Sequence, residues 1–381
     1  ELDGVKGYLN KTGSGKEFGG FLCNENGATV WTARCQFYQN QGKIGGAIYN
    51  NGEIHLGSTS INTNGGSVSG DKYIAEAYTA NGGAVYNDGA GKLYVTDTSY
   101  IDHNATTQNG GGIYNAGYFE PNTLDAYLNQ TGGLGGSLEN TSSGTTNGTN
   151  ANFRASGASY GAGVHNNGSL TLNGGEISTN SATSGAGVSN GNAMNLISVN
   201  ISNNTATSVG GGVLNENQNE NNPCGIKDCT IRGNVANGEK FSYSGAGIYN
   251  TGYLVTDGSN FESNTGLKNG GGLYNIGTME LKETPVFNGN KANGNGSAVY
   301  NDGRINDFHI DATGNMTAES TLYNSDTGAI QAPTFTGNIS ITSNNGYGIH
   351  NAGIFSINSI LYKKFAKEII RFLLFFIISS L

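Results

Sequence analysis

A short motif of the form Gly-Gly-small-aliphatic-Tyr-Asn returns along almost the whole chain, most often every 23 to 28 residues. A period of this length is typical of one coil of a β-solenoid, in which each repeat packs only on its neighbours. Each copy is identified below by its final residue, the marker asparagine. The twelve marker asparagines are Asn24, Asn50, Asn87, Asn115, Asn166, Asn190, Asn215, Asn250, Asn275, Asn301, Asn324 and Asn351.

The residue two positions before each marker is always aliphatic, as at Ile48 and Val85. Further aliphatic residues stand four and six positions after the marker, as at Ile54 and Leu56. Residues two apart lie on the same face of a β-strand, so these positions predict inward-facing side chains. We therefore expect an all-β fold, a single-stranded parallel β-helix of about 12 coils and of the pectate-lyase-like superfold.

The composition fits a periodic chain better than a disordered one. Glycine supplies 63 residues and only 12% of residues are charged, but the evenly spaced aliphatic residues argue against disorder. Glycine and asparagine tolerate the left-handed backbone of tight corners. We expect the marker asparagines to form a ladder of amide hydrogen bonds from coil to coil. A second asparagine, fourteen residues after several markers, repeats at Asn64, Asn180, Asn204, Asn264 and Asn338.

Breaks in the period divide the chain into three parts. Residues 1–18 are expected to form an N-terminal edge or cap, and residues 19–357 the β-helix. The 51-residue step from Asn115 to Asn166 predicts a polar insertion near 118–160, or else a degenerate extra coil plus a loop. We expect an excursion at Gly132–Asn152 that can be deleted without loss of folding. Residues 358–381 are basic and then hydrophobic, which suits a cap, a membrane contact or a truncated end.

The charge and the cysteine content restrict the cellular compartment and the binding partners that can be expected. The formal net charge is -9 and the body has no Lys/Arg cluster, so nucleic acid is not an expected partner. Four cysteines form two sequence-local pairs, Cys23 with Cys35 and Cys224 with Cys229. Both pairs are possible disulfides in an oxidising compartment, although the coil geometry can equally hold either pair apart.

The repeats also resemble a known family. GGAIYN at Gly45–Asn50 and GGGIYN at Gly110–Asn115 alternate with FESN at Phe261–Asn264 and FTGN at Phe335–Asn338. This alternation resembles the GGA[ILV] and FxxN repeats of chlamydial-type polymorphic outer-membrane proteins, over roughly residues 19–357. The resemblance implies a right-handed β-helix that is exported as an autotransporter passenger and acts as an adhesin or surface antigen. Many copies replace Phe by Ile, and no translocator barrel follows in this sequence.

Two groups of residues are candidates for chemistry along the shaft. They are Asp97, Asp102 and His103 in one coil, and Asp302, Asp307, His309 and Asp311 in another. We interpret both as solvated turn and strand residues, and we predict no catalytic residue, no cofactor and no metal site. His165 and His350 lie too many coils apart to share a metal ion.

One column of the motif is mainly aromatic and has opposite parity to the inward aliphatic residues. It contains Tyr49, Tyr86, Tyr114, Tyr249, Tyr274, Tyr300 and Tyr323. These side chains are either an exposed stripe that binds sugars or a partner surface, or a stack that stabilises one face.

The leading functional hypothesis is an extracellular or cell-surface, outer-membrane-associated scaffold without enzymatic activity. It would act in adhesion to a host-surface or matrix protein or glycan, with possible membrane contact through the C-terminal segment. The alternatives are a polysaccharide lyase or glycosidase that acts in a groove along the helix, and a purely structural stalk.

Overall fold

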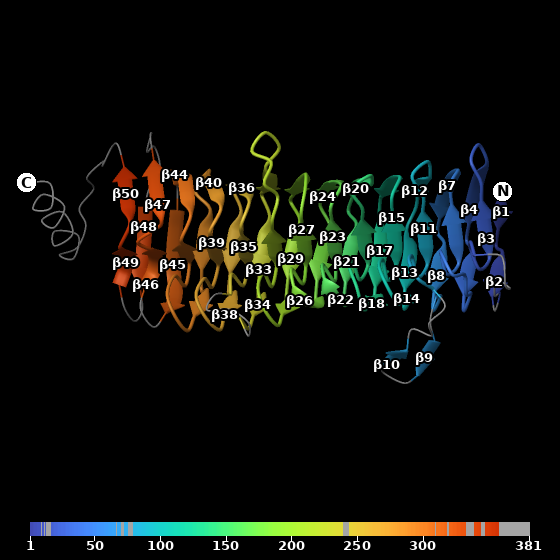
Figure 1. Cartoon of the computed structure of the whole chain (residues 1–381), viewed down its shortest axis with the longest axis horizontal. Coiled ribbons are helices and arrows are strands. Elements are labelled where there is room, and N and C mark those ends of the chain that lie inside the picture. Colours follow the sequence, from blue (N-terminus) through green and yellow to red (C-terminus); the bar gives the residue numbers. More distant parts are fainter. Residues whose placement is uncertain are drawn as a thin grey trace, which may run out of the picture.

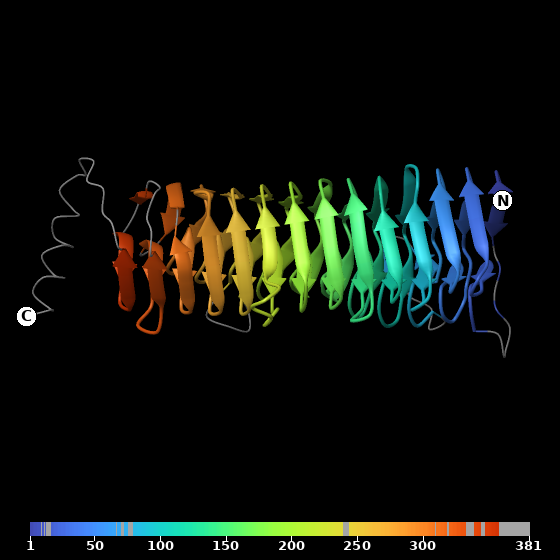
Figure 2. The same ribbon diagram turned by 90° about the horizontal axis from the view of Figure 1, so that it is seen from above.

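The chain forms a straight parallel β-solenoid whose coils stack in sequence order from one end to the other (Figures 1 and 2). The computed structural model describes residues 1–357 apart from 9, 11, 13–16, 66, 70–71, 75–78, 239–243, 309, 318–319, 333–338 and 344–346. These described residues contain strands and turns but no helix. Thirteen strands in the sheet of the markers define twelve steps from coil to coil, which confirms the predicted all-β solenoid of about 12 turns. The handedness stays a prediction.

The 13-stranded sheet contains the marker motif, and the 14-stranded sheet follows it in every coil. The strands of the 13-stranded sheet are β3 (Leu22–Asn24), β6 (Ile48–Asn50), β11 (Val85–Asn87), β15 (Ile113–Asn115), β19 (Leu138–Asn140), β23 (Val164–Asn166), β27 (Val188–Asn190), β31 (Val213–Asn215), β35 (Ile248–Asn250), β39 (Leu273–Asn275), β43 (Val299–Asn301), β46 (Ser320–Asn324) and β49 (Tyr347–Asn351). Those of the 14-stranded sheet are β1 (Leu2–Asp3), β4 (Thr29–Ala33), β7 (Glu53–Gly57), β12 (Lys92–Val95), β16 (Tyr118–Pro121), β20 (Thr145–Thr149), β24 (Ser169–Asn173), β28 (Met194–Ile197), β32 (Cys224–Lys227), β36 (Tyr253–Asp257), β40 (Thr278–Lys282), β44 (Arg304–Phe308), β47 (Ala329–Ala332) and β50 (Ile354–Ile357).

A third sheet and, in eight of the coils, a strip of very short strands complete the solenoid. The third sheet comprises β2 (Lys6–Tyr8), β5 (Gln36–Tyr38), β8 (Ser60–Asn62), β13 (Ser99–Asp102), β17 (Leu124–Tyr127), β21 (Asn152–Arg154), β25 (Glu176–Ser178), β29 (Asn200–Ser202), β33 (Thr230–Arg232), β37 (Asn260–Glu262), β41 (Val286–Asn288), β45 (Ile310–Thr317) and β48 (Ile339–Ser343). The short strands are β14 (Ala105–Thr106), β18 (Gln130–Thr131), β22 (Gly157–Tyr160), β26 (Ser181–Ser184), β30 (Thr205–Ala206), β34 (Val235–Ala236), β38 (Thr265–Gly266) and β42 (Lys291–Ala292).

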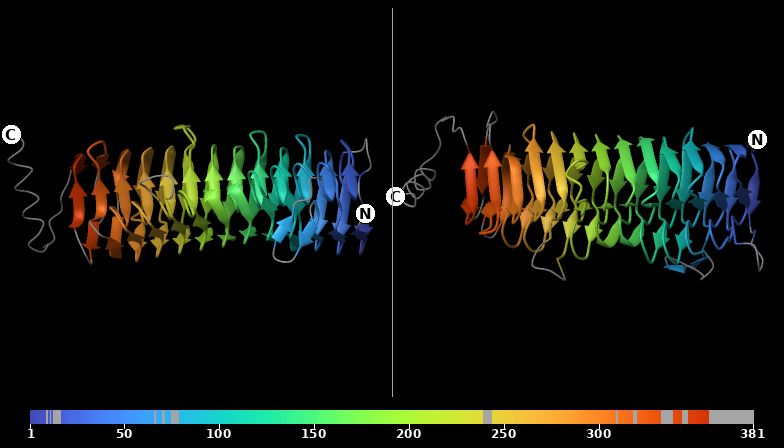
Figure 3. Two further views of the ribbon diagram at one scale, coloured as in Figure 1. Left: turned by 60° about the horizontal axis from the view of Figure 1, so that its bottom comes forward. Right: turned by 45° about the horizontal axis from the view of Figure 1, so that its top comes forward.

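Two segments project from the shaft. The antiparallel hairpin of β9 (Ser67–Ser69) and β10 (Lys72–Ile74) leaves it on one side, and the long turn after Asn215 leaves it on another (Figures 1 and 3). Both segments lie where the spacing between successive copies of the motif is longer than usual. At the N-terminal end β1 and β2 pair with β4 and β5, so this segment forms the first strands of the solenoid.

The predicted insertion near 118–160 is wrong, and the alternative of a degenerate extra coil is the one that the structure shows. Residues of this stretch form β16 to β22, and each strand pairs in parallel with the coil before it and the coil after it. Asn140 pairs with Asn115 on one side and with Asn166 on the other, so it is a thirteenth marker. This copy departs from the motif at Glu139, which stands in the place of the tyrosine, whereas Ser137 and Leu138 still fit the small and aliphatic positions. Deletion of Gly132–Asn152 would therefore remove parts of two stacked coils.

The marker asparagines, all buried except the partly buried Asn351, are joined by a continuous ladder of side-chain hydrogen bonds. In each coil the Nδ2 group donates to the Oδ1 atom of the next marker, and the twelve bonds from Asn24 to Asn351 measure 2.7–2.9 Å. An amide suits this place because its donor serves one neighbouring coil while its acceptor serves the other. All twelve predicted markers belong to the ladder, with Asn140 between Asn115 and Asn166.

The second asparagine column forms another buried ladder at the corner after the third sheet. Asn64 shows its pattern, because both the main-chain N–H and the side-chain Nδ2 donate to Asn104 Oδ1, at 2.9 and 3.0 Å. The column also contains Asn180, Asn204 and Asn264, whereas the predicted Asn338 lies outside the described residues. Ser156 replaces one asparagine, and its Oγ accepts from the main chain of the preceding coil at 3.1 Å.

Aliphatic and aromatic side chains fill the space between the sheets. The residues two before the markers are fully buried except at the two ends, where Leu22 and Ile349 are partly buried. The first glycine of the motif turns the chain into this strand: Gly45 has a φ of 69°, and a Cβ there would lie 2.1 Å from the carbonyl oxygen of Ile48. Because each buried aliphatic side chain contributes roughly 1.5 to 3 kcal/mol, stability accumulates coil by coil.

We predict that Asn166→Ala destabilises the protein much more than Asn167→Ala. The first change leaves Asn140 Nδ2, Asn190 Oδ1 and the Ala193 carbonyl without their partner inside the shaft. Unsatisfied buried groups cost about 1 to 3 kcal/mol each, so a loss on the order of 3 kcal/mol is expected. Urea unfolding followed by circular dichroism measures it. Asn167 is exposed, and equal losses in the two variants would contradict the role of the ladder.

Candidate functional site

The predicted tyrosine column forms two stacks on the outer side of the 13-stranded sheet. Tyr49, Tyr86 and Tyr114 stack with ring centroids 5.7 and 4.7 Å apart. Tyr249, Tyr274, Tyr300 and Tyr323 form the second stack, with spacings of 5.4, 4.5 and 4.7 Å. These rings are half-buried or buried, and each face of an inner ring is covered by its neighbour. The geometry favours a stack that stabilises the coils over an open stripe for a ligand.

Four buried residues separate the two stacks. They are Glu139, His165, Ser189 and Leu214, in successive coils. The His165 Nδ1 atom lies 2.8 Å from Glu139 Oε2. His350, at the far end of the column, lies against Tyr323 with centroids 4.8 Å apart. The two histidines are therefore many coils apart, and each has its own neighbour.

The four cysteines are free thiols, so neither proposed disulfide is present. Cys23 lies in the outward tyrosine column and is exposed, whereas Cys35 faces the core. Cys224 and Cys229 are both buried in one coil. Burial raises the pKa of both thiols, that of Cys229 to about 12, which keeps them protonated and poorly nucleophilic.

The first acid group of the sequence belongs to a larger polar cluster on the third sheet. The Asp102 carboxylate lies 2.7 Å from His103 Nδ1, and Asp97 is exposed and accepts a hydrogen bond from Ser58. On the next two strands, Asp125 accepts from Arg154 Nε at 2.8 Å in a two-bonded pair. Burial raises the pKa of Asp102 and outweighs the lowering by His103.

Tyr127 lies at the centre of this cluster. It pairs in register with Asp102, and the Arg154 guanidinium lies 5.1 Å from the centroid of its ring. The sequence did not identify Asp125, Tyr127 or Arg154 as partners of Asp102 because they fall in the stretch taken for an insertion. Both aspartates thus have a basic partner within the cluster.

The second acid group does not converge on one site. Asp302 lies in a turn and accepts hydrogen bonds from the hydroxyls of Ser325 and Thr327. Asp307 lies on the 14-stranded sheet, opposite Glu280, and Asp311 lies on the third sheet. His309 lies outside the described residues. Within the described ranges, no three His, Cys, Asp or Glu side chains gather closely enough to hold a metal ion.

An aromatic ladder with one exposed end, at Trp31, lies on the outer face of the 14-stranded sheet, and its other rings are half-buried. Trp31 stacks on His55 at 3.6 Å, and His55 stacks on Tyr94 at 4.7 Å. Tyr118 adds a tilted ring 5.7 Å from Tyr94. Trp31 is 51% exposed. The ladder is hidden when the coils are aligned on the marker, because Trp31 and Tyr94 stand seven residues after it and His55 only five.

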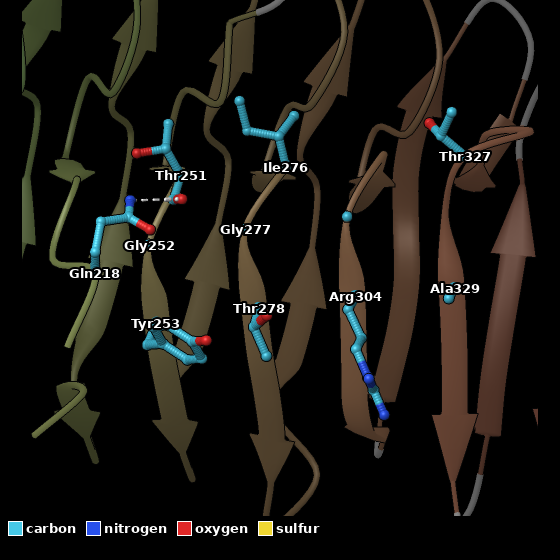
Figure 4. Close-up of a pocket in the computed structure, with 11 residues that line it drawn as sticks. Gln218, Thr251, Gly252, Tyr253, Ile276, Gly277, Thr278, Arg304, Thr327 and Ala329 are labelled. Carbon is cyan, nitrogen blue, oxygen red and sulfur yellow. Dashed lines mark hydrogen bonds between the residues drawn. The ribbon is translucent and has the colours of Figure 1, made fainter. Parts of the chain in front are cut away.

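The same outer face contains an open groove of about 380 Å³ further along the shaft (Figure 4). The groove arises from differences in the length of the turn that follows each marker asparagine. In the coils of Asn250, Asn275 and Asn301 the first inward residue follows four positions after the marker. The preceding coil needs nine positions (Asn215 to Cys224) and the following coil six (Asn324 to Ile330). Three short turns between two longer ones leave a depression.

Glycines form the floor of the groove, and two rows of side chains flank it (Figure 4). A Cβ at Gly277 would lie 2.2 Å from the Gly252 carbonyl oxygen, and one at Gly303 would lie 2.2 Å from the Gly277 oxygen, so close coil stacking requires glycine. The flanking residues are Thr251, Ile276 and Thr327 on one side and Tyr253, Thr278, Arg304 and Ala329 on the other. Gln218 closes one end and donates to the Thr251 carbonyl oxygen at 3.0 Å.

Comparisons with models of protein families, with curated proteins and with solved structures found no match. The described residues also form no helix with the length and apolar character needed to cross a bilayer. The predicted C-terminal segment, 358–381, lies outside the described residues.

We predict that the stacked tyrosines ionise late in an alkaline titration. Burial is the main cause that raises the pKa of Tyr86 and of Tyr300 from 10 to about 12. A raised pKa means that these rings stabilise the fold below about pH 10 and that this contribution is lost as the pH rises towards 12. Phenolate absorbance should show a late phase that shrinks in Tyr86→Phe and Tyr300→Phe. Urea-unfolded protein is the control, and a single phase near 10 in the native protein would refute the stack.

Proposed function

We propose that this chain is a surface-exposed or secreted β-solenoid scaffold of the adhesin or autotransporter-passenger type. It binds a glycan or a protein of a host or matrix surface and carries out no reaction. The supporting observation is the outer face of the 14-stranded sheet, which has the aromatic ladder from Trp31 to Tyr118 near one end and the groove at Gly252–Gly303 several coils further along. Exposed aromatic side chains such as Trp31 are typical of binding surfaces.

The distribution of charge supports binding over catalysis. In the polar cluster of the third sheet Asp102 lies against His103 and Asp125 is held by Arg154, so both carboxylates are already engaged. The second acid group is spread over a turn and two sheets. A rigid shaft that repeats its hydrogen bonds in every coil presents its outer side chains without having to order them on binding.

A glycoside hydrolase is the second candidate, and one observation favours it. Asp102 and Asp125 lie on neighbouring strands, two register positions apart, which places their Cβ atoms roughly 7 Å apart. The raised pKa of Asp102 suits a general acid, and Asp125, which is held by Arg154, supplies the second carboxyl group that such an enzyme requires.

One experiment distinguishes the two candidates. The purified protein is applied to arrays of polysaccharides and host-surface extracts, and retention is scored with the release of reducing or unsaturated sugar ends. We expect retention without product, and roughly tenfold weaker retention in Trp31→Ala and Tyr94→Ala, because each removes an aromatic contact. Tyr160→Ala removes an exposed ring elsewhere and serves as the matched control. Product that disappears in Asp102→Asn but persists in Asp97→Asn would establish the hydrolase instead.

A further inference from the structure

We infer that the groove at Gly252, Gly277 and Gly303 binds a short stretch of a neutral, hydroxyl-rich polysaccharide. This inference rests on the proposed function and names the ligand class of one part of the outer face. The groove is open to solvent and follows the shaft across three short turns (Figure 4). Three coils at ~4.8 Å each give it a length on the order of 15 Å, which accommodates a few linked pyranose rings.

Three side chains of the groove donate their protons to the protein itself and leave acceptor oxygens for a ligand. The Thr251 hydroxyl donates to a main-chain carbonyl oxygen of the preceding coil at 3.2 Å. In the last coil of the groove the Thr327 hydroxyl donates to the Asp302 carboxylate. The Gln218 amide uses both its protons, on the carbonyl oxygens of Glu216 and Thr251 at 3.2 and 3.0 Å, so its Oε1 atom remains an acceptor (Figure 4). The lining therefore selects a ligand that donates hydrogen bonds, as sugar hydroxyls do.

The charges around the groove oppose a charged polymer of either sign. Arg304 is the one residue with a full charge among the eleven that line the groove, and it has partners of its own, among them Asn306. Glu280 and Asp307 lie opposite each other in register on β40 and β44, the strands that carry the groove. A polymer of carboxylates only accepts hydrogen bonds and is repelled by these two acids. A cationic polymer is repelled by Arg304, whereas an uncharged polymer of hydroxyls meets neither barrier.

The lining also offers apolar surface for the faces of sugar rings. Ile276 is 40% exposed, and the ring of Tyr253 lines the same stretch of the groove (Figure 4). Sugar rings present hydroxyls at their edges and C–H groups on their faces, so a site for them needs both kinds of partner. The groove supplies apolar surface and acceptor oxygens within three coils.

An extended peptide also donates hydrogen bonds, but it is a weaker match for this surface. Peptides that add to a sheet need unpaired main-chain groups at its edge. Here Thr278 N–H donates to the Gly252 oxygen at 2.9 Å, and Arg304 N–H donates to the Gly277 oxygen at 2.8 Å. The main chain of the floor is thus used in bonds between coils. Recognition therefore has to come from side chains that repeat once per coil, and this suits a polymer of similar rings.

Calorimetric titration of the full chain with defined oligosaccharides tests the inference. The neutral probes are oligomers of glucose, galactose, mannose and xylose, from dimers to hexamers. The charged probes are oligomers of galacturonate and of glucosamine, matched in linkage to galactose and glucose oligomers. We expect at least one neutral oligomer to bind, with an affinity that rises with length until the groove is filled. Its charged counterpart should bind at least tenfold more weakly.

Variants of the lining place the binding in the groove. Thr278→Trp, which fills the groove, should abolish binding. Thr251→Val and Thr327→Val each remove one acceptor oxygen and keep the shape of the side chain, so each should weaken binding roughly threefold to tenfold. Thr145→Trp is the matched control, because Thr145 is an exposed threonine in the same outward column of the 14-stranded sheet as Thr278 but outside the groove.

Binding that persists in Thr278→Trp, or that is equally tight for neutral and charged probes, overturns the inference. So does a failure of every neutral probe. In those cases retention on the arrays that depends on Trp31 and Tyr94 still supports the scaffold, whereas loss of all retention refutes the proposed function itself. Unchanged melting curves exclude misfolding of the variants.

Discussion

The coil-to-coil hydrogen bond between identical side chains is the constraint on which this structure depends. A buried amide has to satisfy two donors and an acceptor away from water, and an identical amide one coil away can meet this need from either side. The markers do so in bonds of 2.7–2.9 Å from Asn24 to Asn351. Since each asparagine needs a neighbour at the same place, the ladder fixes the register of all three sheets at once. A slip by one residue would break it and expose the aliphatic row as well.

This requirement holds the interior constant and leaves the exterior free to vary. An inward aliphatic residue precedes every marker and glycines that admit close stacking recur in most coils, but the turn after the marker takes four, six or nine positions to reach the next inward residue. A longer turn costs little because it lies in water and its ends are already fixed by the stacked strands. Turn length is thus the means by which a uniform shaft acquires a groove, and the groove arises where short turns succeed one another between longer ones.

The same division explains what the sequence could predict. The fold could be predicted from the aliphatic residues two positions before the markers, such as Ile48 and Val85, because stacking requires the same residue type in every coil. The coil of Asn140 was missed since Glu139 occupies the tyrosine position, which also holds His165, Ser189 and Leu214, so the motif has no strict identity there. The error had a further consequence: Asp125, Tyr127 and Arg154 were set aside as part of an insertion, although they surround Asp102. The aromatic ladder of Trp31, His55 and Tyr94 could have been found by counting from the inward aliphatic residue rather than from the asparagine.

The proposed binding function would therefore use other side chains of each coil than those that stabilise the shaft. The stacked tyrosines next to the markers cover one another, and burial raises the pKa of Tyr86 and Tyr300. These rings therefore stabilise the shaft. Trp31 and the groove residues lie instead on the 14-stranded sheet, where the outer side chains do not have to match the coil above. Because the main chain beneath them is fixed by bonds to both neighbouring coils, substitutions at Tyr253, Thr278 or Arg304 change the surface without changing its support. A solenoid of this kind can change its outer surface while its fold is preserved, since these outer side chains are not those that hold one coil on the next.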